Sequence, residues 1–216
     1  MNPTGLDELL QHPSLWRANS SQDAERVLPT GFRRLDERLP GGGWPLDTLI
    51  ELLLPAHGIG ELNLLLPALR AFCARDGHAP RWIAWLGPPH LPYAPALASA
   101  GLDPARMLVV RSNSTRPPGS SLWAMEQALR SRACIAALGW ADAAEGQSLR
   151  RLKLAAEEGG SLGFLFRPRE RSREPSPATL RLLLEPRDSG LDVHILKSRG
   201  GLPGKVEAVL KRADSG

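Results

Sequence analysis

The feature that most constrains the fold is the segment 49–67, LIELLLPAHGIGELNLLLP. An apolar run ends in a turn that contains proline and glycine, and a second apolar run follows at once. The first run, almost uniformly apolar, is typical of a parallel strand covered on both faces. In the second run leucines recur at helical spacing. The segment therefore predicts a buried strand, a tight loop and a helix, which is the local arrangement of a phosphate-binding loop.

The loop lacks the side chains that phosphate binding requires. The functional pattern is G-x-x-x-x-G-K-[ST], in which the lysine neutralises phosphate and the hydroxyl holds magnesium. In this sequence Pro55 occupies the position of the first glycine and Gly60 that of the second, with Gly58 inside the loop. Glu61 occupies the position of the lysine, and Leu62 that of the serine or threonine. A carboxylate repels a triphosphate, and leucine cannot ligate magnesium. Because a carboxylate is favourable at a helix N-terminus, we expect Glu61 to replace the anion and the loop to bind no cofactor.

The rest of the chain alternates strands and helices, which predicts a mostly parallel sheet flanked by helices. After it, two strand-like runs around EPRDSG predict a C-terminal antiparallel hairpin. The domain prediction is an N-terminal helix and tether over 1–28, a core over 29–197 and a flexible basic tail over 198–216. The predicted strands lie at 48–54, 81–86, 107–112, 133–140 and 161–168, and the hairpin at 179–198.

The segment before the loop, LPTGFRRLDERLPGGGWPLDTLIELLLP, resembles the corresponding part of RecA recombinases. Within that superfamily, GGGWP followed by ELL, the lysine-free GIGEL and the N-terminal LWR resemble the ImuA family, which is RecA-like and associated with translesion DNA synthesis. That family is related to the cell-division inhibitor SulA. The resemblance covers about 28–197 and implies a RecA-like core. The matching positions are Thr30, Gly31, Leu35, Asp36, Leu39, Gly41–Gly43, Pro45, Leu49 and Glu51.

The resemblance also implies what the protein does. The acidic catalytic positions of RecA fall in Gly87-Pro88-Pro89 and near Gly139, so we expect no enzyme. The implied function is a non-catalytic adaptor in SOS-induced translesion synthesis, linking RecA and damaged DNA to an ImuB-type scaffold and an error-prone polymerase. A SulA-like inhibitor of FtsZ and of cell division is the first alternative. A divergent DNA-dependent ATPase is the second.

An arginine series offers a candidate DNA-binding surface. In FRPRERSREP, four arginines occupy every second position. In an extended segment this spacing points the guanidinium groups to one side, where they can contact phosphates. The alternative is a solvated charged loop. The four residues are Arg167, Arg169, Arg171 and Arg173.

Two apolar groups outside the predicted core are candidate partner-binding residues. Leu15 and Trp16 lie in the polar tether, where they can anchor a neighbouring subunit or partner, or can pack on their own core. Val206, Val209 and Leu210 form a weak amphipathic segment in the tail, suited to folding on a partner or else simply disordered. Self-association is compatible with either group.

Composition excludes several classes of protein. The formal net charge of +4 and pI near 9.6 permit an acidic partner. Cys73 and Cys134 have neither the spacing nor the neighbours of a metal site, so we expect free thiols in a reducing compartment. The N-terminus lacks the apolar core of a secretory signal, and no run approaches the length of a membrane span. We therefore expect a cytoplasmic protein without membrane contact.

Overall fold

The computed structural model of the protein describes residues 27–75, 81–111, 119–188 and 190–211. Leu15 and Trp16 lie outside these residues, as does the expected N-terminal helix and tether up to residue 26. The elements, in chain order, are β1 (Val27–Leu28), α3 (Arg33–Asp36), η1 (Pro40–Gly42), β2 (Trp44–Pro45), β3 (Leu49–Leu54), α4 (Glu61–Arg75), β4 (Trp82–Leu86), α5 (Ala94–Ser99), η2 (Pro104–Arg106), β5 (Met107–Val110), α6 (Ser120–Arg130), β6 (Cys134–Trp140), α7 (Gly146–Gly159), β7 (Leu162–Pro168), η3 (Arg169–Arg173), β8 (Leu180–Arg187), β9 (Gly190–Ser198) and β10 (Gly204–Lys211).

An eight-stranded sheet runs through the described part of the chain, in the order β10-β9-β8-β3-β7-β6-β4-β5. All pairs from β8 to β5 are parallel, whereas β8, β9 and β10 pair antiparallel. The prediction of a mostly parallel sheet with a C-terminal antiparallel hairpin is confirmed. Strand β3, which the opening sequence segment identifies, lies between β7 and β8 near the middle of the sheet.

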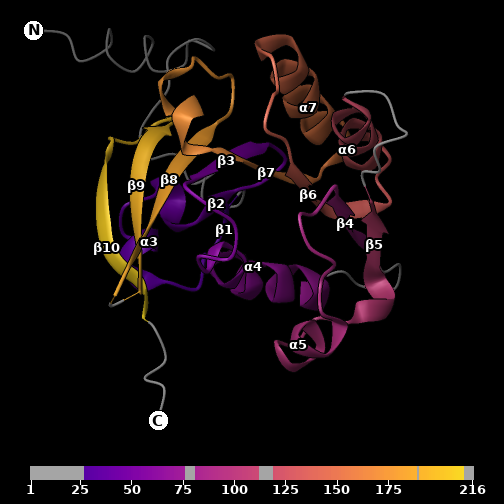
Figure 1. The fold of residues 1–216 in the computed structure, drawn as a ribbon, viewed down its shortest axis with the longest axis horizontal. Coiled ribbons are helices and arrows are strands. Elements are labelled where there is room, and N and C mark those ends of the chain that lie inside the picture. The colour runs from indigo at the N-terminus through magenta and orange to yellow at the C-terminus, as the bar shows by residue number, and fades with distance from the viewer. Residues whose placement is uncertain (1–26, 76–80, 112–118, 189, 212–216) are drawn as a thin grey trace, which may run out of the picture.

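Helices cover both faces of the parallel part of the sheet. Figure 1 shows α4 and α5 on one face and α6 and α7 on the other. Alternate side chains of β3 pack against the helices on opposite faces of the sheet. Ile50 and Leu52 belong to the apolar cluster that includes α4, whereas Leu49 packs with α6 and α7. Every residue of β3 is buried, which explains its almost uniformly apolar sequence. Among the described residues, no helix is both long enough and apolar enough to cross a membrane.

The prediction of a flexible tail that begins at residue 198 is wrong for residues 204–211. These residues form β10, which pairs with β9. Val206 and Val209 are buried in the core, so their prediction as partner-binding residues is also wrong, and Leu210 is partly buried against the same cluster. The cause is a bulge: the pairing register shifts between Val206 and Leu210, and Ala208 has a φ of 49°. The bulge turns both valines inward, although their spacing in the sequence resembles that of a helix.

Asp192 of β9 holds this bulge in place. Its Oδ1 accepts the Ala208 amide at 2.9 Å, and its Oδ2 lies 2.9 Å from the Lys205 ammonium and 3.1 Å from the Arg187 guanidinium. The Ala208 amide most of all, followed by Lys205 and Arg187, lowers the pKa of Asp192 to about 2, against the opposing effect of its burial. The charged carboxylate therefore stabilises the folded hairpin.

We expect this contribution to depend on pH. The folded pKa lies below the unfolded value of 3.8, so the stabilisation is complete above about pH 5 and is lost as the pH falls toward 2. Asp192→Asn should lower the free energy of unfolding at pH 7 and flatten its decline between pH 5 and pH 2. Urea unfolding at several pH values measures this. Asp188→Asn, which changes an exposed carboxylate of the same hairpin, is the control and should keep the wild-type profile. A wild-type profile for Asp192→Asn would contradict the assignment.

Candidate functional site

The loop between β3 and α4 contains its own anion. Gly58 and Gly60 have φ values of 83° and 100°, which favour glycine and bend the chain tightly into the helix. Glu61, the first residue of α4, turns its carboxylate back into the loop, where Oε1 accepts the Gly58 amide at 2.9 Å. Glu61 is only 4% exposed, and its other carboxylate oxygen has no hydrogen-bond partner among the described residues. A loop amide of the kind that binds phosphate elsewhere is thus occupied by a side chain of the same chain.

The surroundings of the loop are apolar. Leu62, at the position of the magnesium-binding hydroxyl, packs against the core cluster. Leu210 of β10 lies over the second glycine, because a Cβ placed on Gly60 would lie 3.5 Å from Leu210 Cδ1. Pro55, at the position of the first glycine, is exposed. No group of three or more histidine, cysteine or acidic residues that could hold a metal ion occurs in the described part of the chain. Apart from His57, which is exposed, the described residues 55–62 of the loop and helix start carry no basic side chain that could bind phosphate.

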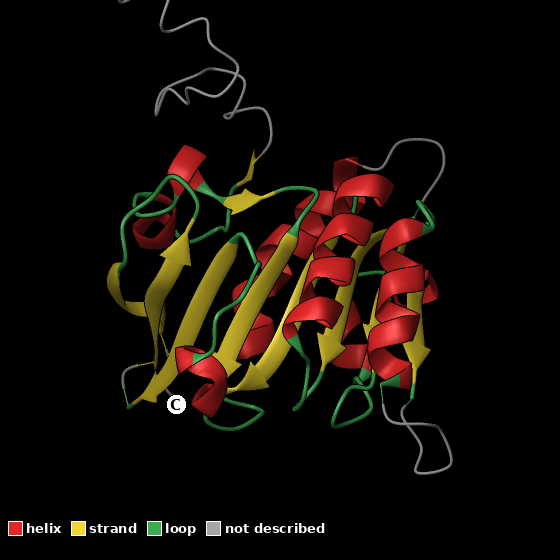
Figure 2. Cartoon of the chain, turned by 90° about the horizontal axis from the view of Figure 1, so that it is seen from above, coloured by secondary structure: helices red, strands yellow, loops and turns green. Residues whose placement is uncertain are grey.

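A second feature lies at the same edge of the sheet. Strands β3, β7, β6 and β4 are parallel, so the loops that follow them share the carboxyl edge, at the bottom of Figure 2. The loop after β4 carries Leu91 and Tyr93, which are 70% and 71% exposed. Pro88, Pro89 and Pro92 flank them and restrict the backbone. Leu91 and Tyr93 are not among the site residues predicted from the sequence, although large apolar side chains between prolines are a signal that the sequence contains.

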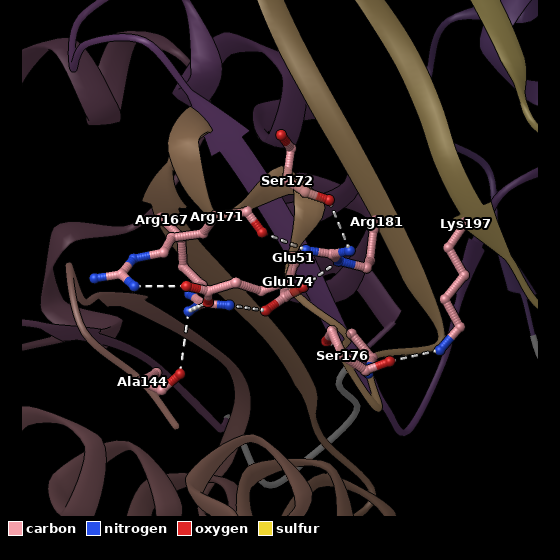
Figure 3. A network of polar contacts seen from close by, with 10 residues as sticks. Glu51, Ala144, Arg167, Arg171, Ser172, Glu174, Ser176, Arg181 and Lys197 are labelled. Carbon is pink, nitrogen blue, oxygen red and sulfur yellow. Dashed lines mark hydrogen bonds and ion pairs between the residues drawn. The ribbon is translucent and has the colours of Figure 1, made fainter. Parts of the chain in front are cut away.

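A network of buried charged side chains joins strands β7, β3 and β8 (Figure 3). Glu51 of β3 is fully buried and accepts hydrogen bonds from Arg167 of β7 at 2.8 Å and from Arg181 of β8 at 2.5 Å. Both arginines are themselves buried. Three adjacent strands are therefore joined through one carboxylate that is bound on both oxygens.

The same arginines fix the segment that follows β7. Arg167 also donates to the Ala144 carbonyl at 3.1 Å and to the Glu174 carboxylate at 3.0 Å. Hydrogen bonds from Arg171 first, and then from Arg167, lower the pKa of Glu174. Arg181 donates to the Arg171 carbonyl at 2.9 Å and to the next carbonyl at 3.3 Å. Arg181 therefore ties the backbone of η3 to β8, and Arg167 ties the side chain of Glu174, the residue after η3, to β7 (Figure 3).

These contacts correct the prediction of four arginines on one extended surface. Arg167 is 1% exposed and bound to Glu51, so it cannot reach DNA. Residues 169–173 form a 3-10 helix, so alternate positions no longer point the same way. The predicted alternation fails because β7 continues through Pro168 and places Arg167 on the inside of the sheet. Arg169, Arg171 and Arg173 are partly or fully exposed, and their contact with DNA stays a prediction.

We expect Glu51→Gln to destabilise the protein strongly. The amide keeps the shape but removes the charge, so the buried Arg181 guanidinium loses its carboxylate partner and the buried Arg167 keeps only the partly exposed Glu174, at a cost of about 3–5 kcal/mol. Thermal and urea unfolding measure this loss. The matched control is Glu37→Gln, which breaks an exposed pair with Arg33 and should change stability by no more than about 0.5 kcal/mol. Equal effects of the two substitutions would show that the buried network contributes little.

Comparison with known proteins identifies relatives of two kinds. A cell division inhibitor SulA from Photorhabdus laumondii is 33% identical over 119 residues, which are 55% of this chain and 63% of the relative. A protein ImuA from Caulobacter vibrioides is 31% identical over 147 residues, 66% of this chain and 58% of the relative. For these relatives the chain spans about three fifths of their length. The SulA of Yersinia enterocolitica is 31% identical over 126 residues, 71% of its length.

A crystal structure of SulA from Pseudomonas aeruginosa superposes with a TM-score of 0.44 at 24% identity, over 55% of this chain and 97% of that one. No protein-family model matches the sequence. At this identity and coverage, the chain belongs to the family of ImuA- and SulA-related proteins.

Proposed function

We propose that the protein is a non-catalytic, RecA-like adaptor of the cytoplasm that acts in SOS-induced translesion DNA synthesis. The observation that carries this proposal is the Glu61 carboxylate, which accepts the Gly58 amide inside the phosphate-like loop. A triphosphate in this loop would have to displace the nearly buried Glu61 carboxylate, which is negatively charged like the triphosphate. The loop then serves to hold β3 and α4 together, and the function rests on surfaces that contact other macromolecules.

The positions of the missing acidic residues support a role without hydrolysis. Gly139 of β6 packs directly under α6, because a Cβ placed on it would lie only 2.5 Å from Met125 Sδ. A carboxylate therefore does not fit at Gly139 unless Met125 moves. The other position falls in Gly87-Pro88-Pro89, which has no ionisable side chain. Neither of the two positions at which the resemblance places an acidic catalytic residue carries a carboxylate, which supports a role without ATP hydrolysis.

The surface formed by the loops at the C-terminal ends of the parallel strands is the one that best suits a protein partner. Leu91 and Tyr93 expose large apolar side chains on a loop whose prolines limit the entropy lost on binding. Tyrosine is among the residues that most often contribute strongly to interface energy. We assign this edge to an ImuB-type scaffold, which would connect the protein to an error-prone polymerase and to RecA on damaged DNA. Leu15 and Trp16 remain proposed as a second anchor for a partner or a neighbouring copy.

Inhibition of FtsZ, and so of cell division, is the second candidate function. The observation in its favour is that relatives named cell division inhibitor SulA reach the same identity as ImuA, 31–34%. The same edge would then contact a different partner. A binding experiment therefore has to offer both partners to the same protein.

We expect the full chain, immobilised, to capture a purified ImuB-type scaffold. Leu91→Ala with Tyr93→Ala should reduce capture at least roughly tenfold, because losing two interface anchors costs more than about 1.4 kcal/mol. Leu202→Ala, which removes an equally exposed apolar side chain elsewhere, is the control and should bind like wild type. RecA and the error-prone polymerase are tested in parallel. Capture of FtsZ instead of these proteins would favour the second candidate, and capture that requires ATP and magnesium would favour the ATPase.

For DNA, we expect weak binding without sequence preference through Arg169, Arg171 and Arg173. Changing all three to Ala should weaken binding to every sequence alike and reduce the log–log salt slope by up to about 2–3, roughly 0.7–0.9 for each phosphate contact. Arg167 is left unchanged because it is part of the core. Fluorescence titration at several salt concentrations measures both quantities. Arg33, Arg34 and Arg150, all exposed, are changed to Ala in the control. Equal losses in the two variants would show general charge attraction only.

A further inference from the structure

A pocket opens between α6 and α7, the two helices that cover one face of the sheet (Figure 1). Its volume is about 170 Å³, comparable to a cavity of about 150 Å³ that can hold a benzene molecule. Leu122 and Trp123 of α6 and Leu152 of α7 form its apolar walls. Trp123 is 59% exposed, although tryptophan is on average a well-buried residue. The pocket therefore offers apolar contact to a side chain that comes from outside.

The polar side of the pocket is built around Glu126 of α6. Its side chain is only 8% exposed, and its two oxygens accept hydrogen bonds from Arg130, at 3.1 Å, and from Arg151 of α7. Arg130 also donates to Glu158 at 2.7 Å. Arg151 is 54% exposed and makes no other hydrogen bond or ion pair in the described part of the chain. A buried carboxylate thus fixes one guanidinium group at the pocket and leaves most of its donors free.

The charges around the pocket favour a negatively charged ligand group. A cationic group would have to compete with two arginines for Glu126 and would lie beside the charge of Arg151. A carboxylate, in contrast, matches the free donors of Arg151. Gly119, which also lines the pocket, precedes α6 without a side-chain cap, so the positive end of this helix opens on the same space. Glu145, the residue before α7, is not part of the lining.

We propose that this pocket binds a segment of a protein partner in which a large apolar side chain stands next to an acidic one. The apolar side chain, of the size of leucine or phenylalanine, enters between Trp123 and Leu152, and the carboxylate pairs with Arg151. Tryptophan and arginine are among the residues that most often dominate interface energy, and one of each faces this pocket. Binding costs little ordering of Arg151, because Glu126 already holds it in place.

The inference goes beyond the proposed function. The pocket lies on two helices, whereas the proposed scaffold contact lies on the loop that carries Leu91 and Tyr93. An adaptor and an inhibitor can each use a second docking site, so the pocket does not depend on which candidate function holds. Failure of the pocket to bind would leave the capture of the scaffold through Leu91 and Tyr93 untouched, and the reverse also applies.

Fluorescence anisotropy of a labelled synthetic peptide, Gly-Ser-Asp-Leu-Phe-Gly, titrated with the full chain, tests the proposal. We expect saturable binding. Two further peptides replace the aspartate by asparagine or by lysine, and both should bind at least roughly threefold more weakly, because each loses the charge pair with Arg151. Absence of saturable binding, or equal or tighter binding of the lysine peptide, would overturn the proposal.

Substitutions at the pocket locate the binding. Trp123→Ala should weaken binding of the aspartate peptide at least roughly tenfold, because it removes an interface anchor. Trp82→Ala, which removes another exposed tryptophan outside the pocket, should bind like wild type. Unchanged binding by Trp123→Ala would contradict the assignment, since the loss of so exposed a side chain should leave the fold intact, as thermal unfolding verifies.

A second pair of variants tests the choice of charge. Arg151→Gln should abolish the preference for aspartate over asparagine, whereas Arg150→Gln, at the exposed neighbouring position, should keep it. In the wild-type chain, the aspartate peptide should also shift the indole N–H resonance of Trp123 more than that of Trp82, each identified by its loss in the alanine variant. A preference that survives Arg151→Gln, or equal shifts of the two indole resonances, would show that the peptide binds elsewhere.

Discussion

The fold depends on one buried carboxylate. Glu51 lies in the middle of the central strand β3, and its two oxygens accept hydrogen bonds from Arg167 of β7 and Arg181 of β8. Isolated, any of these charges would be very costly in the interior. Together they satisfy most of each other's hydrogen bonds, and they fix the relative register of three strands in a way that apolar packing alone does not. The network also marks where the parallel part of the sheet meets the antiparallel part, because β8 belongs to both.

The loop at the end of β3 follows the same principle. In a nucleotide-binding relative of this arrangement, the positive end of α4 would be matched by a phosphate that comes from solution. Here Glu61 supplies the negative charge from the first residue of the helix itself, and Leu62 and Leu210 close the surroundings with apolar groups. A side chain that is always present makes the stability of this corner independent of any ligand. This is the basis on which we propose that the loop connects β3 to α4 structurally and that the function rests on the surfaces around it.

The sequence was sufficient for the parallel sheet because its signals are local. Leu49–Leu54 is apolar throughout since both faces of β3 are covered, and helices with leucines at regular spacing separate the strands. That the Glu61 carboxylate takes the place of a bound anion could also be predicted from the sequence, because helix N-termini favour carboxylates wherever they occur.

Other features depend on contacts between distant segments. Arg167 has the same spacing as three surface arginines, and only its pairing with Glu51, distant in sequence, places it in the core. The bulge in β10 is held by Asp192 of the neighbouring strand, so the sequence pattern within 204–211 does not predict it.

The contacts of the arginines in and beside η3 favour a protein, rather than DNA, as the direct target of this chain. The segment 169–174 contains three arginines besides two glutamates, and Arg171 is paired with Glu174 at 2.5 Å. Arg169 lies 3.8 Å from Glu185, so part of its charge is also compensated. With Arg167 withdrawn into the core, the segment offers far less uncompensated positive charge than its sequence suggests. Affinity for phosphates rises with the number of contacts, so we expect at most a small, unspecific attraction to DNA from this surface. Under the proposed function we therefore expect selectivity to come from protein contacts of the exposed apolar side chains Leu91 and Tyr93, and localisation to DNA to follow from the partner.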